Sequence, residues 1–224
     1  MTYTSEMSVW TSEPSRGLDR ARIVEAAIAV ADRSGAAAVT MKAVATCLNC
    51  TPMALYRHVG NKDGLTDLML DHGAAQIPLA AGDWRPALHA LTLATRAMIK
   101  QHPWFAELVH TRPPAGPNQM RRVEFMLSTL TRAGSTLPEA MTYAAMLDRH
   151  VFGSGLQEAT ESRVETPENL HEAMADMRAR AGEFPNLAAW LSAPSGPPPD
   201  TQFELVLNFL LDGIATQLSR PGRV

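Results

Sequence analysis

Residues 40–62 read TMKAVATCLNCTPMALYRHVGNK, and this stretch decides the fold of the chain. Thr40 can cap a short helix with an apolar inner face, and Asn49 follows where the chain has to turn, since asparagine tolerates left-handed backbone angles. Thr51 and Pro52 are typical of the start of a second helix, because proline costs nothing in the first helical turn. The stretch therefore predicts two short helices joined by a tight turn.

The charge of this stretch favours an anionic partner. It contains no aspartate or glutamate, whereas Lys42, Arg57 and Lys62 carry positive charge, with His58 beside them. The whole chain has a formal net charge of −3, so it is not built to coat nucleic acid over its entire surface. The distribution of charge thus marks this stretch as the longest region near the N-terminus that an anion can approach without repulsion.

The second of the two helices has the chemistry of a reading head for the major groove of DNA. Pro52, Met53 and Ala54 at its start are small or apolar enough to approach base edges and thymine methyl groups. Arg57, further along, can bind a guanine edge or a phosphate. We therefore expect this helix to read sequence.

Phosphate contacts are expected from the residues that follow. Tyr56 and His58 can donate hydrogen bonds to phosphate oxygens, and Lys62 begins the next helix, where its charge and the free N–H groups favour an anion. Such contacts position a protein on the duplex without reading its sequence.

Residues 55–62 read LYRHVGNK and satisfy every position of L-Y-x-H-[FV]-x-[NS]-K. The stretch therefore resembles the helix-turn-helix of the Tet repressor (TetR) family. The turn departs from that family, because Asn49 and Cys50 stand where glycine and valine are usual; asparagine suits the same backbone, and Cys50 is expected in the hydrophobic position. The resemblance implies a regulator that binds operator DNA, with Thr40 and Lys42 also touching the backbone or a base edge. The expected DNA contacts are Thr40, Lys42, Thr51, Pro52, Met53, Ala54, Tyr56, Arg57, His58 and Lys62.

The rest of the chain also predicts helices. Valine and isoleucine never alternate with polar residues over a useful stretch, so a sheet is improbable and the fold is expected to be all-α. One helix lies between Asp19 and Gly35, and another opens at Lys62 with Leu65 and His72 among the residues of its buried face. The remaining helices are expected at 86–100, 104–111, 117–133, 138–161, 167–181, 185–192 and 200–219.

Length and composition indicate two globular domains. The chain has 224 residues, more than the roughly 100–150 of a typical domain, and 46% of them are hydrophobic against 19% charged. We expect a disordered tail at residues 1–15 and a three-helix DNA-binding domain with the helix-turn-helix at 16–62. Residues 63–224 are expected to form a larger helical bundle for ligand binding and dimerisation.

A second resemblance concerns the larger domain. Its run Trp84, Thr111-Arg112-Pro113, Glu124, Leu137-Pro138-Glu139-Ala140 and Gly153 is similar in order and spacing to the effector domain of the tetracycline repressor. That domain binds a magnesium–drug chelate through histidine and glutamate. The corresponding positions fall on Leu108 and at or beside Gln157, and the nearby His110 and Glu158 do not make a coordination sphere. The resemblance therefore implies a small-molecule effector bound without a metal or cofactor.

An effector pocket is expected between the helices of this domain. Aromatic and methionine side chains adapt to varied apolar ligands, although each of them is equally suited to plain core packing. The expected lining residues are Trp104, Phe105, Phe125, Met146, His150 and Phe152.

The helix at 200–219 has an unusually wide apolar arc. A helix that is hydrophobic over more than a third of its circumference buries two sides, which a terminal helix can do against its own domain and against a partner chain. We expect a homodimer through the helices at 138–161 and 200–219, bound to a nearly palindromic operator. The alternative is a fully buried helix of a monomer.

Other functions have less support. Cys47 and Cys50 form a C-x-x-C pair, which can hold half of a zinc site or act in redox chemistry, but the chain has no second pair, so packing in a turn is the preferred interpretation. No apolar run reaches the roughly 20 residues of a membrane span, and residues 1–15 lack the basic and apolar blocks of a secretory signal. The expected location is the cytoplasm.

An enzyme is also a poorer interpretation. Asp148 and His150 flank Arg149 on a predicted helix, with Glu158 and Glu161 beyond, but side chains two positions apart point to different sides of a helix. The sequence contains no nucleophile elbow, P-loop or dinucleotide fingerprint. A helical adaptor that binds another protein without sequence-specific DNA binding stays open as the alternative to a regulator.

Overall fold

The computed structural model describes residues 18–163, 168–193 and 196–220, and within these ranges it contains helices and loops but no strand. The predicted all-α fold is therefore confirmed. The tail expected at residues 1–15 lies outside the described residues. Within the described ranges no helix has the length and apolar character needed to cross a membrane.

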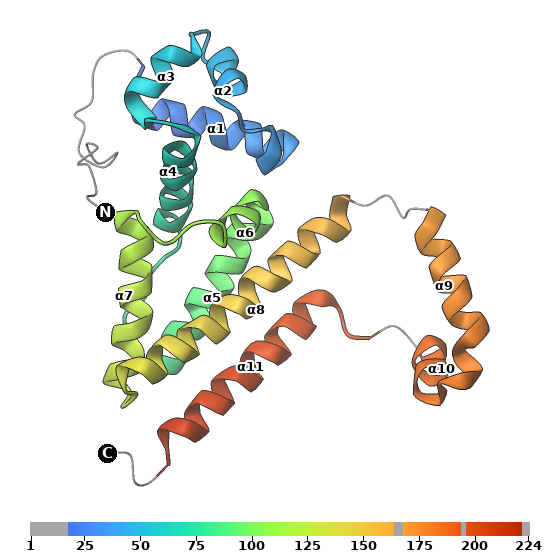
Figure 1. Ribbon diagram of the computed structural model, residues 1–224. Coiled ribbons are helices and arrows are strands. Elements are labelled where there is room, and N and C mark those ends of the chain that lie inside the picture. Colours follow the sequence, from blue (N-terminus) through green and yellow to red (C-terminus); the bar gives the residue numbers. More distant parts are fainter. Residues whose placement is uncertain (1–17, 164–167, 194–195, 221–224) are drawn as a thin grey trace, which may run out of the picture.

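Every predicted helix is present, with ends within two residues of the expected ones, the usual uncertainty of a helix terminus. Figure 1 shows a small group of helices at one end, a larger bundle, and α4 running from one to the other. The small group comprises α1 (Arg20–Ser34), η1 (Ala36–Ala38), α2 (Met41–Cys47) and α3 (Pro52–Val59), and is called the head. Helix α4 (Lys62–Ala75) connects the head to the bundle. The rest comprises α5 (Trp84–Gln101), α6 (Trp104–Val109), α7 (Pro117–Arg132), α8 (Leu137–Arg163), α9 (Glu168–Arg180), η2 (Ala181–Glu183), α10 (Pro185–Ser192) and α11 (Pro199–Leu218).

The head forms where the sequence places its caps. Asp19 Oδ1 accepts a hydrogen bond from the N–H of Arg22 at 2.8 Å, and Thr40 Oγ1 accepts one from the N–H of Ala43 at 3.1 Å, so α1 and α2 begin at capped residues. Asn49 has a φ of 50° in the turn between α2 and α3. The caps predicted at Asp19 and Thr40 and the left-handed turn are thus confirmed.

One small core fixes the orientation of the three head helices. Ile23 and Ala27 of α1, Val44 of α2, and Leu55 and Val59 of α3 are fully buried. Because these residues define the inward faces, the opposite faces of α2 and α3 are turned to solvent.

Helix α4 is shared between the head and the bundle. It packs on α1 and α3 in the head and on α6 and α7 in the bundle. Its inner residues Leu65 and Met69 are fully buried. The prediction that His72 belongs to the buried face is wrong, because His72 is exposed and the neighbouring Asp71 is buried in its place. A polar residue therefore occupies a core position of α4.

The bundle is built on the long helices α5 and α8, with α7, α6 and α11 packed around them. Glycine permits the closest approach, because a Cβ added at Gly155 of α8 would lie 2.5 Å from Ile99 Cγ2 of α5. Helix α11 contributes Phe203, Leu207 and Leu211 to the same core.

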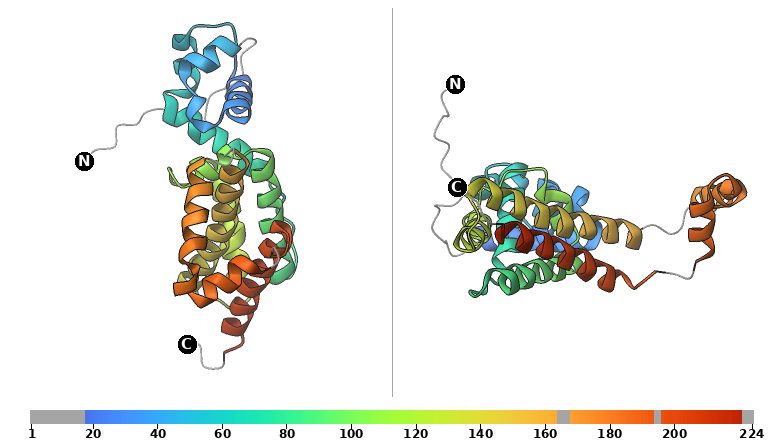
Figure 2. Two further views of the ribbon diagram at one scale, coloured as in Figure 1. Left: turned by 90° about the vertical axis from the view of Figure 1, so that its right-hand side faces the viewer. Right: turned by 90° about the horizontal axis from the view of Figure 1, so that it is seen from below.

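Helices α9 and α10 stand apart from this bundle. Figures 1 and 2 show them set off to one side of the bundle. Phe184 and Trp190 of this arm are 49% and 64% exposed. The core that positions the head and the bundle therefore does not depend on α9 and α10.

The contact between α8 and α5 predicts opposite effects at two glycines of α8. Gly155→Ala should destabilise the protein by about 1–3 kcal/mol, since the new methyl group would overlap Ile99. Gly153→Ala is the matched control: nothing lies within 4 Å of the added carbon, so it should stabilise the helix by about 0.5–1 kcal/mol. Urea unfolding followed by circular dichroism measures both, and equal effects would contradict the close packing.

Candidate nucleic-acid interface and effector cavity

The residues expected to contact DNA lie on α2 and α3, at the N-cap positions before these two helices, and in the first turn of α4, and their side chains are accessible. Met53 and Tyr56, two large apolar or aromatic residues, are 66% and 42% exposed. Large exposed groups of this kind have no role in the core of the head and are free to contact a partner. The exposed members of the set are Thr40, Lys42, Thr51, Pro52, Met53, Tyr56, Arg57 and Lys62, and the half-buried members are Ala54 and His58.

The positive charges of this face are not neutralised within the described ranges. Lys42, Arg57 and Lys62 have no carboxylate within ion-pair distance there. Thr51 precedes α3 as its N-cap residue, yet its side chain makes no capping hydrogen bond. Hydroxyl, ammonium and guanidinium donors therefore stand free to meet phosphate oxygens.

The two cysteines lie at the helix-turn-helix turn in the free thiol form. Cys47 is exposed, and Cys50 is half-buried and packs against the core. Cys50 therefore occupies the hydrophobic position that was expected for it.

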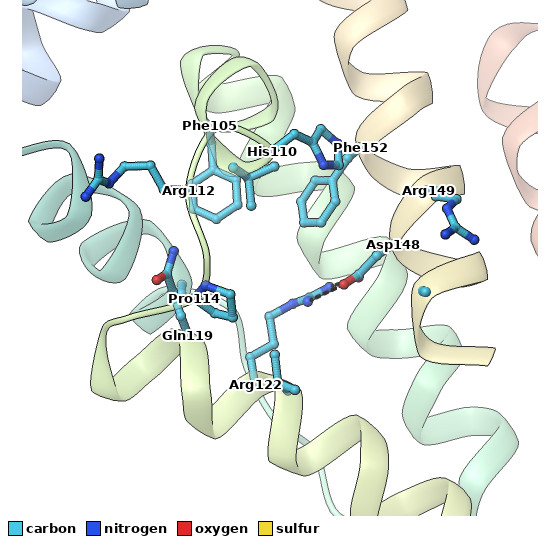
Figure 3. A pocket seen from close by; sticks show the side chains of 13 residues that line it. Phe105, His110, Arg112, Pro114, Gln119, Arg122, Asp148, Arg149 and Phe152 are labelled. Atoms are coloured by element: carbon cyan, nitrogen blue, oxygen red, sulfur yellow. Dashed lines mark hydrogen bonds and ion pairs between the residues drawn. The ribbon is translucent and has the colours of Figure 1, made fainter. Parts of the chain in front are cut away.

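A cavity of about 280 Å³ lies in the bundle between α4, α6, α7 and α8 (Figure 3). Its apolar wall is formed by Ala74, Phe105, Val109, Pro114, Val123, Ala145 and Phe152. Its polar residues are His110, Arg112, Gln119, Arg122, Asp148 and Arg149. A concave, mainly apolar space with a few polar groups is the usual form of a small-molecule site.

The structure brings two of the six expected pocket residues, Phe105 and Phe152, to this cavity. Of the other four, Trp104 is fully buried beside the cavity residues and donates its Nε1 hydrogen to Asp32 at 2.7 Å. Met146 lines a separate groove between α8 and α11, and Phe125 packs partly buried against the core. Aromatic content alone could not separate lining residues from packing residues.

His150, the remaining expected pocket residue, lies against α11. Its ring stacks on Phe203 at 4.3 Å, and its Nε2 donates to the carbonyl of Phe203 at 3.0 Å. Burial lowers the pKa of His150, which the carbonyl hydrogen bond opposes, and the charge of Arg96 lowers it further. The side chain therefore serves the contact between α8 and α11.

Sequence reasoning missed the polar groups of the cavity. Arg122 binds Asp148 through both Nη atoms, at 3.1 and 2.6 Å. Asp148 therefore has a guanidinium partner, while His150 faces Phe203. Asp148 and His150 do not form an acid–base pair. The sequence does show opposite charges on two predicted neighbouring helices. Predicting that these two side chains meet also requires the register of one helix against the other, which the sequence does not give.

No metal site accompanies the cavity in the described part of the chain, where no group of three or more His, Cys, Asp or Glu side chains is placed to hold an ion. His110 packs edge-on against Phe152 at 5.4 Å, and Glu158 accepts a hydrogen bond from Arg96 at 2.6 Å. The two residues weighed as shifted metal ligands thus have different partners.

Two sets of carboxylate contacts join α4 to the cavity wall. Arg112, in the loop between α6 and α7, donates to Asp67 through Nε and Nη2 and lies 3.2 Å from Asp63. The hydrogen bond to Asp67 raises the pKa of Arg112.

The second set lies at the start of α7. Buried Asp71 accepts from the N–H groups of Asn118 at 2.7 Å and Gln119 at 3.0 Å, and from Asn118 Nδ2 at 2.7 Å. A carboxylate here satisfies donors that a helix N-terminus otherwise leaves free. Since Gln119 also lines the cavity, α4 is bonded directly to the cavity wall.

Comparison with known proteins identifies both parts of the chain. Residues 23–69 match the family described as "Bacterial regulatory proteins, tetR family", and residues 78–218 match "Tetracyclin repressor-like, C-terminal domain". The chain belongs to the TetR family. It is accordingly a helix-turn-helix transcriptional regulator, and since this family is not one of enzymes, the expectation that the chain is not an enzyme is confirmed.

Individual TetR-family relatives agree with this assignment. The chain is 33% identical over 217 residues to the HTH-type transcriptional repressor DrrR1 of Streptomyces coeruleorubidus, covering 90% of this chain and 80% of that protein. It is 33% identical over 204 residues to an HTH-type transcriptional regulator of Saccharopolyspora erythraea, covering 88% and 85%. The crystal structure of Streptomyces coelicolor ActR in complex with actinorhodin superposes with a TM-score of 0.80 at 25% identity, covering 92% and 100%.

The exposed face of the head predicts two kinds of DNA-binding variant. Lys62→Gln should weaken binding to all DNA sequences alike, because a lysine at the start of a helix contacts the phosphate backbone of DNA and not the bases. It should also lower the salt dependence of the affinity by about one phosphate contact per head. Met53→Ala should change the preference among operator variants, since Met53 is exposed at the start of the reading helix. Fluorescence anisotropy at several salt concentrations measures the affinity of each variant for each operator sequence and the salt dependence of that affinity.

Arg132→Gln is the matched control for the loss of charge, because Arg132 is the last residue of α7. Figure 1 shows that α7 ends on the side of the bundle away from the head. Arg132→Gln should leave the affinity for DNA, its salt dependence and the preference among operator variants unchanged. If Lys62→Gln affected one operator sequence only, its assignment as a phosphate contact would be wrong.

Proposed function

We propose that this TetR-family protein is a cytoplasmic, homodimeric repressor that leaves its operator when a small molecule enters the cavity of the bundle. Residues 16–62 form the DNA-binding domain in this proposal, and residues 63–224 bind the effector and the second copy. The ten exposed and half-buried head residues contact DNA as assigned from the sequence. The observation that carries the proposal is the direct bonding of α4 to the cavity wall.

The relatives support repression and effector binding. The relative DrrR1 is named a transcriptional repressor, and ActR has been crystallised with actinorhodin and with (S)-DNPA. The cavity of this chain is near the lower end of the volumes that hold small ligands, about 300–1,000 Å³.

The contacts of α4 provide a physical route between the two sites. A ligand that moves Arg112 or Gln119 moves the partners of Asp67 and Asp71, which lie on the helix that also packs against α1 and α3. Because such coupling is reciprocal, a ligand weakens operator binding by the same factor by which the operator weakens ligand binding.

The apolar face expected to pair two copies is open in the single chain. Leu205, Val206 and Phe209 of α11 are 50%, 41% and 65% exposed, and Met141 of α8 is 59% exposed. Soluble monomers rarely leave so many large apolar groups together on neighbouring helices. We therefore assign the faces of α8 and α11 to a symmetric interface, which would set the spacing of the two heads on the operator.

The interface predicts that Phe209→Glu shifts the protein from dimer to monomer, because it places a charge in a face that needs to be desolvated. Sedimentation velocity measures the mass of the species in solution. Met120→Glu is the matched control, since Met120 is 52% exposed on α7, outside the proposed interface. If both variants stayed dimeric, or the wild type were a monomer, this interface would be excluded.

The proposed function is tested by binding to the promoter region beside the protein's own gene. Specific, salt-sensitive binding in a gel shift supports a regulator, whereas binding that ignores sequence supports the adaptor alternative. A panel of compounds is then screened for one that both raises the melting temperature and frees the DNA.

Asp67→Asn should reduce the release of DNA by such a compound, because it weakens the bond between α4 and Arg112 while the head is unchanged. Operator affinity without compound should stay near the wild-type value. Glu124→Gln is the matched control, being an exposed carboxylate on α7. Release that is unaffected by Asp67→Asn would exclude this route.

A further inference from the structure

The ion pair in the cavity does not use the Nε atom of its arginine. Arg122 is 7% exposed, and both of its Nη atoms bind Asp148. Its Nε is buried and donates to no acceptor in the described part of the chain. A guanidinium has five N–H donors in a rigid fork, so the edge on the Nε side can receive a second oxygen-bearing group.

The three arginines of the cavity lining differ in how free they are to meet an anion. The lining contains Arg112, Arg122 and Arg149 with one carboxylate, Asp148, and Arg112 is paired outside the lining with Asp67 and lies 3.2 Å from Asp63. Figure 3 shows Arg112 extending toward α4 and Arg149 pointing away, while Arg122 reaches across the cavity toward Asp148. Because Arg112 is already paired with Asp67 and Arg149 points away, Arg122 is the guanidinium placed to touch a ligand.

The remaining wall favours a flat aromatic body. Phe105 and Phe152 lie with ring centroids 6.0 Å apart, and His110 meets Phe152 edge-on. The guanidinium carbon of Arg122 lies 5.5 Å from the centre of the Phe152 ring, so the charged group and the aromatic wall adjoin. At interior packing density, a cavity of about 280 Å³ holds roughly two or three fused aromatic rings.

We infer that the effector of this cavity is an aromatic anion of two or three fused rings, whose carboxylate or phenolate oxygen accepts from the Nε edge of Arg122. The ring system packs against Phe105 and Phe152. This inference rests on the proposed function, because it names the chemical class of the ligand for the same cavity. Asp148 holds the guanidinium in place for the second oxygen and is thus a positioning residue.

The test compares anthracene-2-carboxylate with the neutral 2-(hydroxymethyl)anthracene, using the intrinsic fluorescence of both probes and the full-length protein. The carboxylate should bind about 10- to 100-fold more tightly, since hydrogen bonds to charged groups are stronger than neutral ones. Arg122→Met combined with Asp148→Leu removes both charges without leaving either one unpaired. This double variant should bind the two probes about equally.

Arg149→Met is the matched control, because it removes one charge from the same cavity wall at a side chain that points away. It should keep most of the preference for the carboxylate. If it abolished the preference as fully as the double variant, the overall field and not Arg122 would select the anion. Equal binding of the two probes by the wild type, binding of neither, or a preference that survives in the double variant would each overturn the inference.

Operator binding by the same samples separates this inference from the proposed function. If the protein binds its operator and a neutral compound releases it, the proposed function holds and the inference of an aromatic anion is wrong. A protein that binds no operator yet prefers the carboxylate through Arg122 refutes the proposed function and supports the anion.

Discussion

The buried carboxylate of Asp71 is the constraint on which the two halves of the molecule depend. It lies in the middle of the helix that belongs to both the head and the bundle, and it receives two backbone N–H groups from the first turn of α7. Gly116 makes this approach possible, because a Cβ there would lie 2.1 Å from Asp71 Oδ1. A buried charge of this kind is stable only while its donors stay in place, so α4 and α7 have to keep their register.

The arginines of the bundle illustrate how one residue type serves different ends. Arg112 is bound by carboxylates of α4 and so fastens the loop after α6 to the shared helix. Arg96 is buried between Glu158 and Asp200, with its guanidinium carbon 4.3 Å from the Phe203 ring, and holds α5, α8 and α11 together. Arg96 and Arg122 each keep a buried Nε that has no acceptor in the described part of the chain, but of these two arginines only Arg122 lines the cavity. The partners, not the residue type, decide which arginine is available to a ligand.

The head and the bundle expose surfaces of different chemistry, which suit different partners. The head buries its apolar residues around Ile23 and Leu55 and exposes positively charged donors that form no ion pair within the described ranges, which suits a polyanion. The bundle exposes apolar groups on α11, such as Phe209, and encloses a cavity, which suits a second copy and a small molecule. Helix α4 is the element through which the two surfaces can influence each other.

The sequence by itself determined the local structure of the head, and with it the family. Caps such as Thr40, the left-handed Asn49 and the motif at residues 55–62 act through bonds between residues a few positions apart, so they can be read from the chain. Helix positions in the bundle were also predictable, since helical periodicity and Pro and Gly breaks are local signals.

Only the tertiary structure decided which residues meet around the cavity. Phe105 lines it and its neighbour Trp104 does not, although the two are adjacent aromatic residues in the same helix. The bonds of Asp71 to α7 and of Arg122 to Asp148 join residues 47 and 26 positions apart, and their formation depends on how α4, α7 and α8 are rotated against one another. A pattern along the chain fixes the face of a helix but not its partner across a core, and that pairing is what makes a site.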